Sequence, residues 1–362
     1  MCIRDSGWSV RTPGLALVNP GLQVKVRGGM GFPGDGTRPR IDLAADLGDA
    51  QVSLAHGFWV HHLMSKTTVQ WLDAALQGGS LHDIHAVVTG DLDDWPFRTE
   101  GGRHGAGIFR VDAKMRGGVL KFQPEWPAAE NMEADIRFEA DGFTVAGRSR
   151  IAGVPVSAFK AGIAHFRRAE LTVDAAAAGD AKDFLGMLRA SPLQKTYGAT
   201  MDNLRVAGPT QAQFHMLLPF HHDQPPPHEL RGDVVLSGAT LREERWKLAF
   251  DQVRGKASYD NAGFAAEGLQ VRHEGRPGVL ALRAGPHVRD TAHAFEAELE
   301  AQIDIDSLLD KTSNLAWLKP HVAGSSAWTL TLGIPRSSAQ GTLAGRLQLR
   351  SNLAGTAIYL PE

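Results

Sequence analysis

Long stretches of this chain alternate strictly between apolar and polar residues. From Phe295 to Asp306 every second residue is apolar, and Glu, Gln or Asp fills each position between. A period of two gives a β-strand one apolar face and one polar face. The same alternation occurs at 109–114, 134–139 and 347–350. Short turn sequences rich in Gly, Asn and Asp separate such runs, which favours antiparallel meanders over parallel strands with long crossovers.

Three short segments have helical spacing instead. A capping-box pattern opens a helix predicted over 67–77, Asp180 caps one predicted over 181–190, and Asp306 caps one predicted over 307–318. Helices this short are marginal alone, so their apolar stripes must pack against a sheet. The predicted fold class is therefore mainly β, with elongated, curved antiparallel sheets in a repeating β-groove and a few short amphipathic helices.

A degenerate block repeats along the chain. Each copy carries one of the predicted helices, then a glycine and a proline that closes a strand: Gly90 and Pro96, Gly208 and Pro219, Gly324 and Pro335. The repeat predicts a partial unit over 7–117, a second over 118–237 and a third over 238–362 that is truncated at the C-terminus. Residues 1–6 have no periodicity, and we interpret them as a non-native or assembly-scar segment. Arrays of one β unit form extended surfaces more often than single catalytic pockets.

Composition removes several function classes. The formal net charge of -2 over 362 residues gives no basic surface for nucleic acid. The only cysteine is Cys2, so a disulfide framework or thiolate metal site within the chain is excluded. No apolar run approaches the roughly 18 residues of a transmembrane helix.

Candidate chemistry is sparse. His82 and His85 have roughly metal-ligand spacing, but no Cys, Asp or Glu at a suitable offset completes a zinc set. We read them, like the histidines at 61–62 and 221–228, as structural or solvated, and expect neither metal nor cofactor. Asp91, Asp93 and Asp94 could serve a carbohydrate-active enzyme with a tryptophan platform, but a turn entering a strand explains them more simply. No nucleophile elbow, P-loop, dinucleotide fingerprint or metalloprotease helix occurs, and no enzyme is predicted.

The chain resembles a known family in its structural punctuation. The motifs are VQWLDAALQGG at 69–79, TGDLDDWPF at 89–97, WP at 126–127, ADIRF at 134–138, GF at 142–143, GSSAW at 324–328, IP at 334–335, LRSNLAG at 349–355 and LP at 360–361. In these the sequence resembles the AsmA-like envelope proteins of Gram-negative bacteria, in particular the large YhdP-type members. The resemblance covers nearly the whole chain after residue 6.

The resemblance implies a fold and a role. It implies antiparallel sheets curved into a long groove, apolar inside and polar outside, in an interior section of a periplasmic bridge. An N-terminal helix missing from this chain would anchor that bridge in the inner membrane. The implied partners are phospholipid carried toward the outer membrane and other envelope proteins. Alternating strands expose more apolar surface than the few predicted helices can cover, and acyl chains would suit what remains.

We therefore predict an apolar groove that binds acyl chains without catalysis. The candidate groove residues come from the alternating strands: Ile136, Phe138, Leu171, Val173, Leu299, Ile303, Leu330 and Leu332. The alternative is a lipid-free β-sandwich in a structural or adhesion module, in which these faces pack against a second sheet. The sequence alone leaves both open.

Overall fold

The computed structural model describes residues 7–19, 21–54, 66–97, 107–168, 170–219, 229–245, 247–310, 313–336 and 345–359. The segment 1–6, interpreted above as non-native, lies outside them. The chain divides into two compact units. The first contains the chain up to Ala177, together with Ala190–Pro192 and His215–Glu229, and the second contains the remainder. The predicted division into three repeats stays a prediction.

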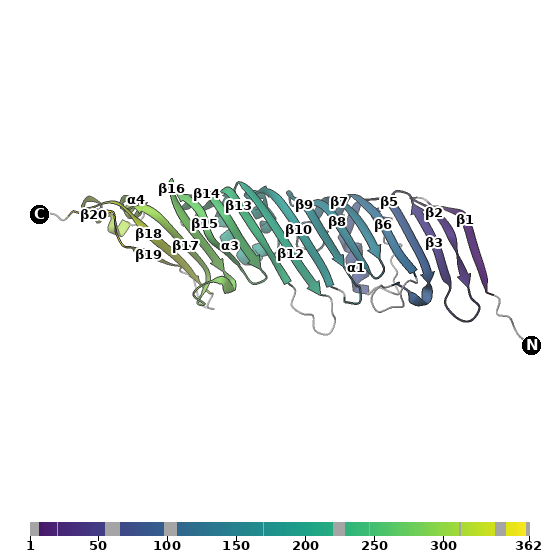
Figure 1. Ribbon diagram of the computed structural model, residues 1–362. Coiled ribbons are helices and arrows are strands. Elements are labelled where there is room, and N and C mark those ends of the chain that lie inside the picture. Colours follow the sequence, from purple (N-terminus) through teal and green to yellow (C-terminus); the bar gives the residue numbers. More distant parts are fainter. Residues whose placement is uncertain are drawn as a thin grey trace, which may run out of the picture. The chain divides into compact units, whose positions relative to one another are not determined.

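The first unit is an open antiparallel sheet. Its strands are β1 (Trp8–Asn19), β2 (Leu22–Phe32), β3 (Arg40–Leu47), β4 (Ala50–Gln51), β5 (Leu76–Asp91), β6 (Gly107–Leu120), β7 (Ala129–Glu139), β8 (Gly142–Ile151), β9 (Val154–Ile163) and β10 (Glu170–Asp180, to Ala177 in this unit). Each long strand pairs antiparallel with the next in chain order, while the short β4 also pairs with β5. Figure 1 shows these strands side by side. Adjacent pairing of sequential strands is the meander that the short turns predict.

The second unit is built in the same way. Its strands are β11 (Leu204–Ala207), β12 (Pro209–Pro219, to Phe214 in this unit), β13 (Glu229–Glu243), β14 (Leu248–Asp260), β15 (Phe264–His273), β16 (Arg276–Ala284), β17 (His293–Asp304), β18 (Val322–Pro335), β19 (Arg346–Ser351) and β20 (Thr356–Ile358). From β13 to β19 each strand pairs antiparallel with the next, β11 pairs with β13, and β20 pairs with the start of β18. The structure thus confirms a mainly β fold of open, curved antiparallel sheets with a few short helices.

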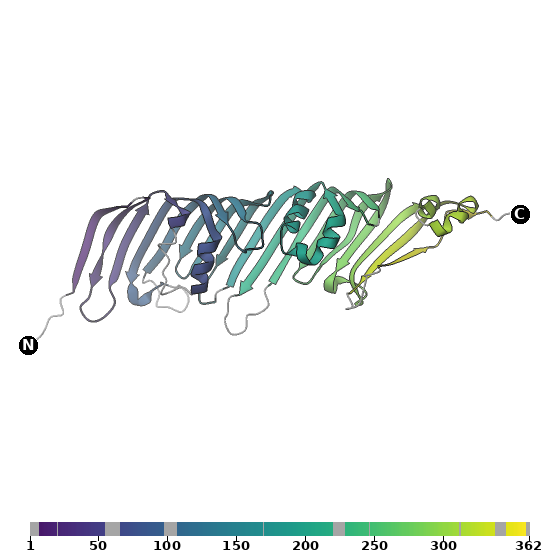
Figure 2. The same cartoon turned by 180° about the vertical axis from the view of Figure 1, so that it is seen from behind.

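The helices lie at strand connections. They are α1 (Lys66–Ala75), α2 (Ala181–Arg189), α3 (Leu193–Asn203) and α4 (Ile305–Asp310), with 3-10 segments η2 (Leu92–Asp94), η3 (Gly285–His287) and η4 (Ser313–His321). Figure 2 shows α1 against one face of the first unit's sheet, and α2 with α3 against one face of the second unit's sheet. Each helix is too short to cover a whole sheet face.

Two details differ from the predicted helices. The segment expected as one helix over 307–318 forms α4 and then η4, which contains Pro320. Proline lacks an N–H and disfavours α-helical backbone in the residue before it, so a continuous α-helix is not sustained there. Helix α3 was not predicted from the sequence. Pro192 was interpreted only as the end of the helix before it, but in the structure it also directly precedes the first residue of α3.

Glycines with positive φ lie at the entry into a strand after α1, α3 and η4. Gly79, Gly208 and Gly324 have φ of +113°, +114° and +111° and follow the helices by a few residues. A Cβ on Gly208 would lie 2.8 Å from Ala239 Cα, so the chain passes too close to β13 for any side chain. Gly90, grouped with Gly208 and Gly324 on sequence spacing, lies instead near the far end of β5, and Gly79 occupies the equivalent place.

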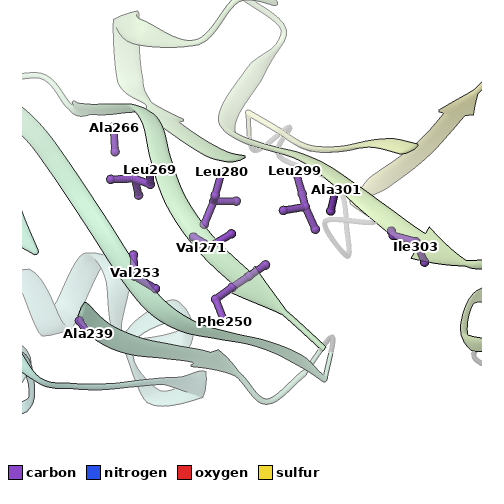
Figure 3. Packing of buried hydrophobic residues seen from close by; sticks show 10 residues of the cluster. All are labelled: Ala239, Phe250, Val253, Ala266, Leu269, Val271, Leu280, Leu299, Ala301 and Ile303. Atoms are coloured by element: carbon purple, nitrogen blue, oxygen red, sulfur yellow. The ribbon is translucent and has the colours of Figure 1, made fainter. Parts of the chain in front are cut away.

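Each unit has its own apolar cluster. In the first, Val52 packs with Met115, Ala129, Met132 and Ala134 of β6 and β7. In the second, the cluster runs over β13 to β17 (Figure 3): Ala239, Phe250, Val253, Ala266, Leu269, Val271, Leu280, Leu299, Ala301 and Ile303. Most of these side chains come from neighbouring strands of one sheet. Bending the sheet around its apolar side brings them together, and the register shifts in several ladders supply that bend.

Candidate functional site

Continuous apolar rows cross the first unit's sheet. Directly opposite residues of antiparallel strands point to the same face, so the pairing register defines which side chains adjoin. The first row consists of Leu15, Val26, Ala45, Ala86, Val111, Phe138, Phe143, Ile163 and Leu171. The second row consists of Ala113, Ile136, Val145, Ala161 and Val173. Four predicted groove residues, Ile136, Phe138, Leu171 and Val173, therefore lie on one face and are half-buried.

The second unit repeats the arrangement. Its third row consists of Leu269, Leu280, Leu299, Leu330 and Leu349, and its fourth of Ala266, Leu282, Ala297, Leu332 and Leu347. Leu299, Leu330 and Leu332, three more of the predicted residues, belong to these rows. Ile303 lies on the same face of β17, opposite Ser326. The eight predicted positions therefore fall on apolar faces, four in each unit.

Burial changes along the third row. Leu299 is 4% exposed, whereas Leu349 on β19 is 38% exposed and its fourth-row neighbour Leu347 is 48% exposed. Ile303 is buried in the same cluster as Leu299. Leu330 and Leu332 are half-buried between these extremes. Two of the predicted groove residues thus belong to the protein's own core, and the remaining six keep accessible surface.

The opposite face is polar and held by ion pairs. In the second unit Arg289 Nη1 lies 2.9 Å from Glu298 Oε2, and Arg276 Nη2 lies 2.5 Å from Asp304 Oδ2. In the first unit Asp112 accepts hydrogen bonds from Arg110 and then Arg137, which together lower the pKa of that carboxyl. Each unit therefore has two chemically different faces.

Within each unit the described strands form one hydrogen-bonded layer, and short helices, not a second sheet, lie beside it. The strand pairs in substantial contact within each unit are hydrogen-bonded neighbours, and the other contacts involve α1, α2, α3, α4, η3 and η4. Sheets in a sandwich lie about 10 Å apart, and a second layer of strands would be visible over the first in Figures 1 and 2, which show a single layer in each unit. Among the described elements, the lipid-free β-sandwich alternative therefore has no facing layer.

The polar residues considered as catalytic or metal-binding have local partners. Asp91 caps η2 by accepting a 3.0 Å hydrogen bond from Asp93 N, and Asp93 Oδ1 lies 3.6 Å from Arg38 Nε. His85 Nδ1 is 2.7 Å from Asp46 Oδ1, and His82 Nδ1 is 2.9 Å from Asp49 Oδ1. The histidines at 61–62 and 221–228 lie outside the described residues. Within the described ranges, His, Cys, Asp and Glu side chains do not gather in threes as metal ligands.

Taken together, these features describe a protein built of open antiparallel sheets, each with one apolar face that stays partly accessible and one polar face. The chain belongs to the YhdP protein family, whose family model matches residues 3–362. It is 24% identical over 367 residues to the "Intermembrane phospholipid transporter YhdP" of Escherichia coli (strain K12). That alignment covers 98% of this chain but 28% of the relative, so the chain spans less than a third of the relative's length. No solved structure matches this chain.

Membership of this family confirms the resemblance inferred from the sequence motifs. The relative's name describes a transporter of phospholipid between membranes. None of the described helices in this chain is long and apolar enough to cross a membrane.

Proposed function

We propose that the apolar rows of both units bind phospholipid acyl chains and that the chain has no catalytic role. In this proposal it is a periplasmic section of a bridge-like envelope protein anchored in the inner membrane, and it supports lipid transport toward the outer membrane. The family assignment and the printed function of the E. coli relative support the lipid and the setting. Phospholipid is the proposed partner, and other envelope proteins would contact the bridge.

One observation carries the proposal. Apolar side chains adjoin from strand to strand across each sheet, and the neighbouring elements are short helices instead of a second sheet. Apolar surface in water is unfavourable by about 25 cal/mol per Å², and burying each CH₂ of an acyl chain gains about 0.8 kcal/mol. A chain of many CH₂ groups laid along such a row would therefore offset the entropy lost on binding.

A matched pair of variants on β18 tests the proposal. Leu332 lies on the apolar face and Thr331 precedes it on the polar face, and both are half-buried. Leu332→Asp places a charge on the face where acyl chains would bind, whereas Thr331→Asp places the same charge on the polar face. We expect phospholipid extracted from the purified protein, measured by mass spectrometry, to fall several-fold in Leu332→Asp and to stay at the wild-type amount in Thr331→Asp.

Equal phospholipid content in both variants and the wild type, with the same circular dichroism, would remove the acyl-chain proposal. Leu299 and Ile303 are unsuitable for this test, because their burial in the core cluster means that a charge there would disturb folding itself.

A further inference from the structure

Aromatic side chains occupy the first row where it passes from β7 to β8, close to one margin of the first unit's sheet. Phe138, near the end of β7, and Phe143, near the start of β8, have ring centroids 5.8 Å apart. Phe166 follows the end of β9 and stacks on Phe143 at 6.1 Å with an interplanar angle of 22°. Phe166 is 46% exposed. The apolar face therefore reaches solvent here through an aromatic ring, the kind of side chain that favours a boundary between apolar and polar surroundings.

Hydrogen bonds hold the turn that carries Phe166 against Asp141, in the turn between β7 and β8. Phe166 N donates to Asp141 O at 2.7 Å, and Arg168 N donates to His165 O at 3.0 Å. His165 Nδ1 lies 3.1 Å from Asp141 Oδ1, and the Asp141 side chain is 6% exposed. We call residues 165–168 the arginine turn. Its backbone position is set by protein contacts and does not depend on a ligand.

Two arginines directly follow Phe166 in the arginine turn. Arg167 and Arg168 are both exposed, and neither has an ion pair or side-chain hydrogen bond among the residues that the structure describes. Arginines elsewhere at this margin are bound to the protein, as Arg110 is to Asp112 with a 2.6 Å Nε–Oδ2 distance. Two acids next to the turn are already engaged, because Asp141 contacts His165 and Glu170, two residues after Arg168, has a partner of its own.

We propose that the arginine turn binds the phosphate of a phospholipid whose acyl chains lie on the first and second rows. This inference rests on the proposed function of those rows. Guanidinium groups match phosphate oxygens in geometry and charge, and they keep their charge at any physiological pH. Phe143 of the first row stacks on the exposed Phe166, and the two arginines come next in the turn, so the sequence of apolar row, aromatic ring and cations matches the order of tail, interface and head in a phospholipid. The head group of the lipid would thus leave the first unit at this margin.

A pair of lipids separates phosphate recognition from tail binding. The full chain, depleted of lipid, is titrated with a fluorescently tail-labelled phosphatidylglycerol and with a diacylglycerol of identical chains. For Arg167→Gln with Arg168→Gln we expect about fivefold weaker binding of phosphatidylglycerol, since exposed charge contacts are individually modest. Binding of diacylglycerol should not change. Arg150→Gln with Lys160→Gln removes the same charge from the exposed polar face of β8 and β9, and should bind both lipids as the wild type does.

Each other outcome identifies what fails. If the arginine variant binds both lipids as the wild type does, the rows bind tails but the arginine turn does not bind phosphate. An equal loss for both lipids, or the same loss in the polar-face control, would also overturn phosphate recognition by the turn. Wild-type protein that binds neither lipid would remove the proposed function and this inference with it. Free sn-glycerol 3-phosphate should not displace the labelled lipid, and displacement at matched concentration would show a phosphate site independent of the rows.

Discussion

Replacing Leu299 by Ala tests whether the curved sheet makes its own core. Leu299 lies in the third row between Leu280 and Leu330, and its exposed fraction is only 4%. Truncation removes three carbon atoms from a packed cluster and leaves a cavity that the backbone of a hydrogen-bonded sheet cannot readily close. Large-to-small changes of this kind cost about 2–5 kcal/mol of unfolding free energy. We expect a loss of about 3 kcal/mol.

The same substitution at Leu349, where the third row ends on β19, is the control. Leu349 has the same neighbour Leu330 and the same face, but it is 38% exposed. Much of its side chain already contacts water and no closed cavity would form, so Leu349→Ala should cost about 1 kcal/mol.

Urea unfolding of lipid-depleted protein, followed by far-ultraviolet circular dichroism, compares the two variants without a contribution from bound lipid. A fall in the midpoint with an unchanged slope gives the stability difference. If Leu299→Ala loses no more unfolding free energy than Leu349→Ala, then Leu299 does not belong to a packed core at the middle of the row.

Two further predictions concern how strands and helices join in the second unit. Gly208→Ala forces a Cβ to within 2.8 Å of Ala239 Cα at a φ of +114°, so we expect a loss of about 1–3 kcal/mol in unfolding free energy and a lower thermal midpoint. Gly186→Ala on α2, where a Cβ would meet open space, should instead stabilise the protein by up to about 1 kcal/mol and raise the thermal midpoint. Asp180 caps α2 by accepting from Lys182 N at 3.0 Å, and this hydrogen bond lowers the pKa of Asp180. Its stabilising contribution, about 1 kcal/mol, should be present above the unfolded-state pKa near 4 and disappear as pH falls through the lower folded-state pKa. Urea midpoints of Asp180→Ala and wild type should therefore differ at pH 7 and converge as the pH falls through that lower pKa, and a constant difference would contradict the cap.

The alternating pattern was sufficient to predict the strands and their faces. The run from Phe295 onward forms β17 as far as Asp304, with its acidic residues on the polar side and Leu299 on the apolar side, while its last two residues, Ile305 and Asp306, belong instead to the first turn of α4. A period of two determines faces without knowledge of neighbours, because it depends on backbone geometry alone. The short turns likewise indicated that each strand would pair with the next.

Burial and cross-strand contacts could not be predicted in this way. Leu299 and Leu349 have the same local pattern, yet one is buried and the other open, because burial depends on which strands and helices lie beside each residue. The stack of Phe143 with Phe166 requires the register of β8 and β9, which sequence spacing does not specify. Spacing also selected Gly90 over Gly79 as a repeated position, since the helix-to-strand geometry that requires a positive φ is visible only in the fold.

Photocrosslinking along β18 tests whether phospholipid contacts the apolar face of the sheet and not its polar face. A benzophenone amino acid is placed in turn at Thr329, Leu330, Thr331 and Leu332, which alternate between the polar and apolar faces. After irradiation in cells, phospholipid adducts on the purified protein are counted by mass spectrometry. We expect adducts at Leu330 and Leu332, which lie on the apolar face, and none above background at Thr329 and Thr331. Adducts of equal yield at all four positions, or at none, would contradict this expectation.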